Sequence, residues 1–220
     1  MSDARSQVLG AIRAALGGGD RAEARRTAAE RIAAHARNII PARTNRPAGE
    51  LANLFASMAT EVAATVERVV DLDGVPDAVA AYLASLNLPA EARVAPDVAG
   101  LPWDRRPTLT ITAGPARDGD AVSVTGAFAA VAETGTLMLT SGPGHPTTLN
   151  FLPDTHIVVL PRSRIVATYE DGWDRLRAEG AVPRTVNFVT GPSRTGDIEQ
   201  TIQLGAHGPR RLHILLVEGA

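Results

Sequence analysis

The apolar positions after residue 47 follow two alternating periods, which predict helices that alternate with strands. Leu51 and Phe55 recur at helical spacing in a helix expected over residues 48–64. Further helices are expected after Pro76 and over residues 169–179. Short apolar runs bounded by turn residues predict strands; in chain order these are Val66–Leu72, Ala92–Ala95, Thr108–Ala113, Val122–Thr125, Leu137–Thr140, Ile157–Leu160, Val186–Val189 and Leu212–Val217. Such alternation is typical of a parallel α/β sheet.

The first 46 residues differ from the rest of the chain in charge. They contain nine arginines and four acidic residues, a formal charge of +5, whereas the remaining residues hold 13 arginines and 20 acids, a charge of −7. Two helices are expected here, the first with Val8, Ile12 and Leu16 on one face. We therefore expect a basic helical arm at residues 1–46 and an α/β domain at residues 47–220. Such an arm either docks on a partner protein or, more commonly, packs on its own body.

The composition excludes several classes of chemistry. The chain has no cysteine, which rules out disulfides, a cysteine nucleophile and thiolate ligands for an iron–sulfur cluster within it. All 22 basic residues are arginine, so a Walker-A or Schiff-base lysine is also excluded, and arginine must bind any anion. The sequence shows no signal peptide and no apolar run of membrane-spanning length, so we expect a cytoplasmic protein. A net charge of −2 argues against nucleic-acid binding.

The segment from residue 185 to 218 sets a polar loop between two apolar strands, which is a natural place for function. Its Gly191-Pro192-Ser193-Arg194-Thr195 stretch follows a strand and is expected to precede a helical turn. Successive backbone N–H groups and the Arg194 guanidinium in this stretch suit phosphate or carboxylate. Asp197 and Glu199 follow, but no histidine stands at metalloprotease spacing, so no metal site is expected. A plain connecting turn is the alternative.

A second candidate is the turn Glu133-Thr134-Gly135-Thr136, which lies between two apolar segments. Glycine permits a tight turn there. A carboxylate on such a turn suits a nucleophile, a general base or a ligand anchor, with the neighbouring hydroxyl and N–H groups binding substrate. The alternative is a glutamate that only caps local backbone donors.

One of the five histidines is the main candidate for acid–base or hydrogen-bonding chemistry. It is His207, which Gly208 and a second nearby glycine hold on a loop before Pro209. The second candidate is His145. The others are expected to be structural (His156 and His213) or solvated (His35). Ser193 with His207 resembles a nucleophile pair, but the absence of G-x-S-x-G disfavours a hydrolase.

Three stretches, taken together and in this order, resemble the LUD domain of the lactate-utilisation protein C (LutC) family: AETGTLML at 132–139, LPDTHIVVL at 152–160 and TGPSRTGDIEQTIQLGAHGPRRLHILLVE at 190–218. The resemblance implies the three-layer fold of the NagB/RpiA/CoA-transferase-like group, with a parallel sheet and helices on both faces. It also implies a role in oxidising L-lactate to pyruvate alongside iron–sulfur proteins of the same operon.

Within this resemblance, Glu133–Thr136 form one edge of a cleft, and Gly191–Thr195, Asp197, Glu199 and His207–Pro209 form the other. Arg194 would pair with the substrate carboxylate and His207 would take the hydroxyl proton. The chain itself would hold no cofactor, because its lack of cysteine leaves iron–sulfur clusters to partner proteins. Two alternatives remain: a stand-alone enzyme that binds a sugar phosphate or acyl-CoA, and a non-catalytic scaffold whose basic arm docks on an acidic partner.

Overall fold

The computed structural model describes residues 3–17, 21–196 and 202–220, which fall into two compact units at residues 1–39 and 40–220. The second unit is built on a six-stranded sheet of order β1-β12-β7-β4-β2-β3, in which every pair of neighbours is parallel. Its strands are β1 (Thr65–Val69), β2 (Glu91–Val94), β3 (Thr110–Ala113), β4 (Val122–Gly126), β7 (Thr155–Pro161) and β12 (Arg211–Val217). The predicted α/β class with a parallel sheet is confirmed.

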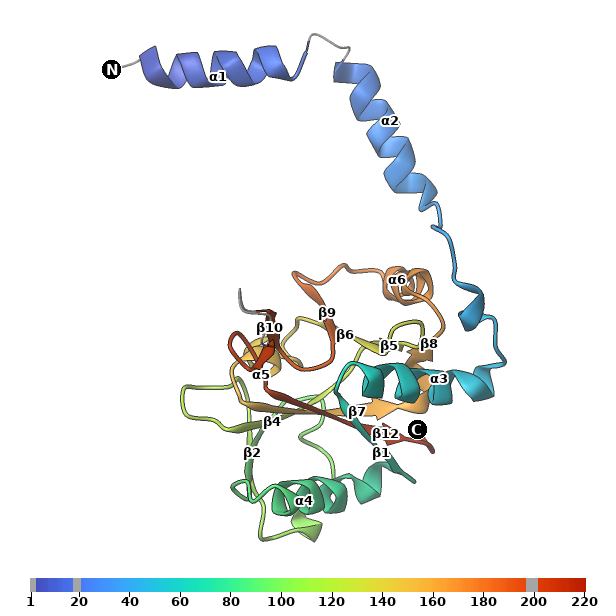
Figure 1. Cartoon of the computed structure of the whole chain (residues 1–220), viewed down its shortest axis with the longest axis vertical. Coiled ribbons are helices and arrows are strands. Elements are labelled where there is room, and N and C mark those ends of the chain that lie inside the picture. The colour runs from blue at the N-terminus through green and yellow to red at the C-terminus, as the bar shows by residue number, and fades with distance from the viewer. Residues whose placement is uncertain (1–2, 18–20, 197–201) are drawn as a thin grey trace. The chain divides into compact units, whose positions relative to one another are not determined.

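Both faces of the central strands β7 and β12 are buried, and they belong to two different cores. Figure 1 shows the helices and the second sheet that cover the two faces. Because side chains alternate along a strand, Ile157 and Val159 of β7 enter one core while Val158 and Leu160 enter the other. The first core is closed by α4 (Val75–Ser85), the short helix η3 (Trp103–Arg105) and α5 (Thr148–Phe151). The second core is closed by α3 (Ala48–Glu61) and by a second sheet.

The second sheet was not predicted, since its strands carry the same apolar runs as the first. It has the order β8-β5-β6-β9. The strands are β5 (Ala129–Val131), β6 (Thr136–Thr140), β8 (Ile165–Val166) and β9 (Val186–Thr190), and the β5–β6 and β6–β9 pairs are antiparallel. Its outer face packs Phe128 and Met138 against Leu176 of α6 (Tyr169–Ala178). The body therefore layers helix, sheet, sheet and helix from α4 to α6 (Figure 1).

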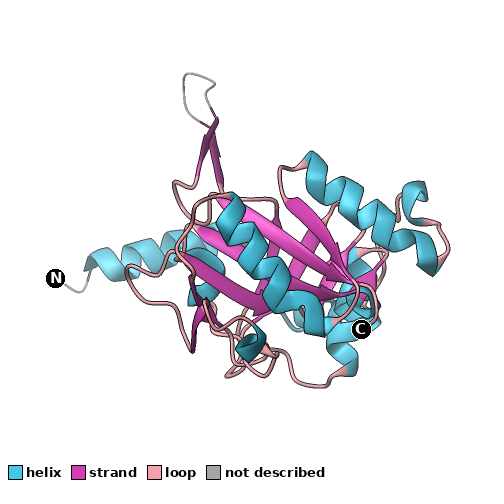
Figure 2. Ribbon diagram, turned by 90° about the horizontal axis from the view of Figure 1, so that it is seen from below, coloured by secondary structure: helices cyan, strands magenta, loops and turns pink. Residues whose placement is uncertain are grey.

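A short hairpin follows β9. In it, β10 (Arg194–Gly196) pairs antiparallel with β11 (Ile202–Leu204). Figure 2 shows these two short strands standing away from the main sheet. The ladder pairs Arg194 with Leu204, so residues 194–196 are extended. The helical turn expected after Thr195 falls mainly on residues 197–201, which lie outside the described residues.

The N-terminal unit contains the two predicted helices, α1 (Asp3–Ala15) and α2 (Arg21–Ala34). Neither helix has a buried residue, and Val8, Ile12 and Leu16 are 59 %, 49 % and 73 % exposed. Three further short helices, η1 (Ala42–Thr44), η2 (Leu72–Gly74) and η4 (Arg162–Arg164), lie in the second unit. No helix in the described part of the chain is long and apolar enough to span a membrane.

Removing residues 1–39 is expected to leave the body equally stable, because α1 and α2 contribute no buried side chain. The thermal midpoint of residues 40–220 should lie within about 3 °C of the full chain, which corresponds to less than about 1 kcal/mol. Differential scanning calorimetry of both proteins measures this, and a drop of about 10 °C would contradict the division into two units.

Candidate functional site

The candidate site is a cavity of about 300 Å³ at the amino ends of β7 and β12. Leu212 of β12 has the strand parity of Ile214 and faces the core shared with the second sheet, while Phe188 and Val189 come from β9 of that sheet. The cavity therefore lies between the amino ends of two central strands of the first sheet and the edge strand β9 of the second. It is lined by Asn150, Phe151, His156, Phe188, Val189, Gly191, Pro192, Ser193, Arg194, His207, Gly208, Pro209 and Leu212.

Two buried polar side chains line this cavity, and each has one polar atom without a partner. Asn150 is 1 % exposed, and its Oδ1 lies 3.1 Å from Nε2 of His145. His156 is fully buried, and its Nε2 lies 2.8 Å from the Thr125 hydroxyl. Among the described residues, Asn150 Nδ2 and His156 Nδ1 have no hydrogen-bond partner. Leaving such an atom unsatisfied costs about 1–3 kcal/mol. A ligand bound in the cavity would supply the missing hydrogen-bond partners.

Burial keeps the imidazole of His156 neutral. Removal from water, with a smaller contribution from nearby His145, lowers the pKa of His156 to about 3. A neutral imidazole has one N–H donor and one acceptor nitrogen, and the Thr125 contact at Nε2 decides which role is left for Nδ1. A hydroxyl group on a ligand can satisfy either role.

The outer wall of the cavity consists of two of the predicted loops, brought together as expected. Ser193 N–H donates to the carbonyl of Pro209 at 2.8 Å, and Gly205 N–H donates to the carbonyl of Ser193 at 3.0 Å. These bonds close the 191–194 turn onto the 207–209 loop. They also occupy the Ser193 N–H, so the expected nest of free backbone donors is smaller than the sequence indicated. Arg194 and His207 are exposed at this wall.

One further predicted residue of this segment, Thr195, does not line the cavity. Thr195 pairs with Gln203 in the hairpin. Asp197 and Glu199 lie outside the described residues.

The Glu133-Thr134-Gly135-Thr136 turn supports the cavity wall and does not line it. Thr134 and Thr136 form a hydroxyl cluster with Tyr169 at 2.8 and 2.9 Å, and Thr136 also contacts the hydroxyl of Thr190 at 2.7 Å. Thr190 directly precedes the cavity-lining Gly191. The half-buried Glu133 donates its backbone N–H to Ala167, and no described group bonds its carboxylate.

Gly135 is explained by packing. It has φ +66°, and a Cβ there would come within 2.2 Å of the backbone nitrogen of Ala59 in α3. The second sheet approaches α3 closely at this point, and only glycine fits.

Sequence reasoning missed Asn150 and Phe151, and it assigned His156 a purely structural role. Asn150 and Phe151 belong to α5, a short helix without a strong apolar period. A signal for His156 was present, because an ionisable side chain in a strand with no exposed residue needs a polar partner. His145, the second-choice histidine, lies behind Asn150 and does not line the cavity.

The carboxyl ends of the same strands, where parallel sheets usually bind ligands, are bridged by side chains. Glu218, directly after β12, pairs with Arg162 at 2.9 Å and with Arg68 of β1. The guanidinium of Arg162 also donates to the carbonyl of Gly49 in α3. The cavity at the opposite end of β7 and β12 is therefore the better candidate.

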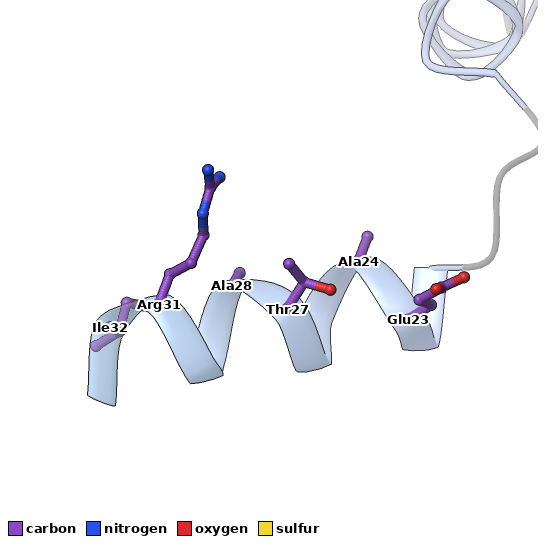
Figure 3. A pocket seen from close by; sticks show the side chains of 6 residues that line it. All are labelled: Glu23, Ala24, Thr27, Ala28, Arg31 and Ile32. Atoms are coloured by element: carbon purple, nitrogen blue, oxygen red, sulfur yellow. The ribbon is translucent and has the colours of Figure 1, made fainter. Parts of the chain in front are cut away.

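The arm offers a different surface, formed by α2 alone. Figure 3 shows the side chains that line it, which come from Glu23, Ala24, Thr27, Ala28, Arg31 and Ile32. All of them are exposed and lie along a single helix. Exposed side chains of one helix do not form an enclosed binding site. Across residues 3–17, 21–196 and 202–220, no group of three histidine or acidic side chains is arranged to hold a metal ion.

Comparison with known proteins finds similarity over the part of the chain that lines the cavity. Residues 120–217 match the LUD domain family. An uncharacterized protein of Neisseria meningitidis is 39 % identical over 93 residues, 42 % of this chain and 40 % of that protein. Lactate utilization protein C of a Geobacillus species is 34 % identical over 100 residues, 44 % of this chain and 42 % of that protein. The matched region thus spans about two fifths of these relatives.

A solved structure extends the likeness to most of the fold. The crystal structure of a DUF162 family protein from Deinococcus radiodurans matches with a TM-score of 0.58 and 26 % sequence identity. The match covers 79 % of this chain and 99 % of that protein.

Replacing Gly135 with alanine is expected to destabilise the body by about 2–5 kcal/mol, from the left-handed backbone and the clash with Ala59. The matched control is Gly100→Ala, where an added Cβ meets nothing within 4 Å and φ is not in the left-handed region. Denaturant-induced unfolding measures the free energy of unfolding of both variants. Equal stability of the two variants would contradict the close packing of the turn on α3.

Acid is expected to destabilise the protein through His156. Its folded pKa of about 3 lies below the unfolded value of 6.5, so the unfolded chain binds the extra proton. The stability is complete above pH 6.5 and is lost as the pH falls toward 3, by up to about 1.4 kcal/mol per pH unit. His213, with a pKa lowered to about 4 by burial, acts in the same direction.

Unfolding free energies measured from pH 7 to 4 should therefore have a shallower slope in His156→Gln than in the wild type. His35→Gln, on the exposed arm, should keep the wild-type slope. An unchanged slope in His156→Gln would show that His156 is not buried as a neutral group.

Proposed function

The chain carries a LUD domain over residues 120–217, and on this premise we propose that it is a subunit of a lactate-utilisation system. Its part is to bind a small 2-hydroxy carboxylate, L-lactate in the first place, in the cavity between β9 and the amino ends of β7 and β12. The name of the Geobacillus relative, lactate utilization protein C, supports the pathway. The pair of unsatisfied atoms on Asn150 and His156 carries the proposal for the ligand.

The polar groups of the cavity match the groups of such a ligand. A carboxylate accepts hydrogen bonds, as Asn150 Nδ2 requires. The neighbouring hydroxyl both donates and accepts, so it satisfies Nδ1 of His156 in either tautomer. The apolar side chains of Phe188, Val189 and Leu212 remain for the methyl group.

Two exposed side chains at the outer wall of the cavity extend the proposed site. One supplies a positive charge for the ligand, and the other supplies a proton acceptor. The Arg194 guanidinium forms no ion pair with any described carboxylate, so it is available to a ligand carboxylate. His207, on the adjacent loop, is the proposed acceptor of the hydroxyl proton. The small volume of about 300 Å³ disfavours a ligand as large as acyl-CoA.

Oxidation of the ligand needs an acceptor outside this chain. Conversion of the C2 hydroxyl to a carbonyl releases two electrons and two protons. The chain has no cysteine to ligate a cluster, so we assign the electrons to iron–sulfur proteins that act with it. This chain would bind and orient the substrate and receive the hydroxyl proton, and the hydrogen on C2 would leave as the second proton with the two electrons to the partner proteins.

Titration calorimetry with L-lactate tests the proposal on the full chain. Arg194→Gln should weaken binding about tenfold, or about 1.4 kcal/mol, through loss of a charge-assisted bond. The exposed Arg184→Gln makes the same charge change outside the cavity lining and should bind as the wild type does. Asn150→Leu, which fills similar space without a donor, should abolish measurable binding.

Two results would contradict the proposal. One is the absence of L-lactate binding to the wild type at any pH. The other is an unchanged rate of lactate oxidation when the iron–sulfur partners are assayed without this chain.

A further inference from the structure

The two helices of the N-terminal unit bury no side chain, yet each carries apolar and basic residues in a regular order. On α1, Val8, Ile12 and Leu16 recur every four residues and so form one row along the helix. Leu16 directly follows α1, and its backbone N–H still donates to the carbonyl of Ile12 at 3.0 Å. The neighbouring row is largely basic and consists of Arg5, Leu9 and Arg13. Two guanidinium groups therefore flank the apolar row.

The negative charge of α1 lies on the opposite side of the helix. Successive residues of an α-helix are about 100° apart around its axis, which places Asp3 opposite Ile12. The carboxylate of Asp3 accepts a hydrogen bond from the Gln7 side chain at 2.8 Å. The acid is thus directed away from the apolar row.

Helix α2 repeats this order with smaller side chains (Figure 3). Its apolar row consists of Ala24, Ala28 and Ile32. Ile32 is the largest of the three and is 71 % exposed. Arginines stand on both sides of the row, Arg21 and Arg25 on one side and Arg31 on the other.

The two acidic residues of α2 do not cancel this positive charge. Glu23 lines the same surface at the first turn, but it faces three arginines. Glu30 lies on the far side of the helix, where its carboxylate is 3.8 Å from the guanidinium of Arg26. The surface around Ala28 therefore keeps a net positive charge.

We infer that α1 and α2 attach the protein to an anionic lipid surface, with the apolar rows inserted between the headgroups and the arginines on the lipid phosphates. Arginine suits phosphate because its planar guanidinium binds two oxygens at once. An apolar row beside a basic one is the pattern of helices that lie in the plane of an anionic bilayer. Since two separate helices carry this pattern, an extended lipid surface suits it better than a single groove on a protein.

Co-sedimentation of the full chain with lipid vesicles, in the absence of lactate, tests this attachment. Vesicles of phosphatidylglycerol and phosphatidylcholine in equal parts should bind the chain at least about tenfold more tightly than pure phosphatidylcholine vesicles, because only the former offer anionic headgroups. The difference should shrink as salt is added, since salt screens the arginines from the phosphates.

Two matched pairs of substitutions locate the contact on the helices. Arg25→Gln should weaken binding to the anionic vesicles about fivefold, whereas Arg26→Gln removes the same charge from the far side and should weaken it less than about twofold. Ile12→Ser should weaken binding at least about tenfold through loss of the inserted side chain. Ala14→Ser, on the opposite side of α1, should bind as the wild type does.

Equal binding to the two kinds of vesicle would overturn the inference, and so would equal effects of the two members of either pair. Absence of vesicle binding would also overturn it and would leave an acidic protein surface as the partner of the arm. Failure of lactate to bind in the cavity, which rejects the proposed function, would leave each of these vesicle results unchanged.

Discussion

The alternation of side chains along β7 determines both the core and the site of this protein. The strand is paired with β4 on one side and β12 on the other, and both of its faces are covered. Since side chains alternate, His156 must lie on the same face as Val158 and Leu160, between the two sheets. Its bond to Thr125, on the neighbouring strand, compensates part of the cost of burying an imidazole. The other ring nitrogen has no partner among the described residues.

The second sheet contributes the wall that faces this buried histidine across the cavity. Two glycines bring the sheet against α3: Gly135 abuts the backbone of Ala59, and a Cβ on Gly191 would come within 2.2 Å of the carbonyl oxygen of Val62. Gly191 also begins the outer wall of the cavity. The close approach to α3 therefore fixes where the wall stands. The hydroxyl cluster of Thr136, Tyr169 and Thr190 ties the Glu133–Thr136 turn to the same point. This turn therefore has a structural role, although it does not line the cavity.

The sequence predicted correctly those strands and loops whose signal lies in consecutive residues. The central strands β7 and β12 follow from uninterrupted apolar runs, and the loops at 191–194 and 207–209 follow from their glycine, proline and arginine content. The floor of the cavity depends on contacts between distant residues. Thr125 and His156 are 31 positions apart, and Asp97 and His145 are 48 apart, so no spacing rule joins them. The division into two sheets could not be predicted from the sequence either. The strands β5 and β6 of the second sheet resemble central strands of the first in their apolar content.

The central claim is that the atoms left unsatisfied on Asn150 and His156 mark the place of a small carboxylate. A crystal structure of the full chain grown with L-lactate tests it most directly. The account predicts carboxylate density within hydrogen-bond distance of Asn150 Nδ2, the ligand hydroxyl at His156 Nδ1, and the Arg194 guanidinium turned toward the ligand. Lactate bound elsewhere, with the cavity floor hydrated or empty, would contradict it.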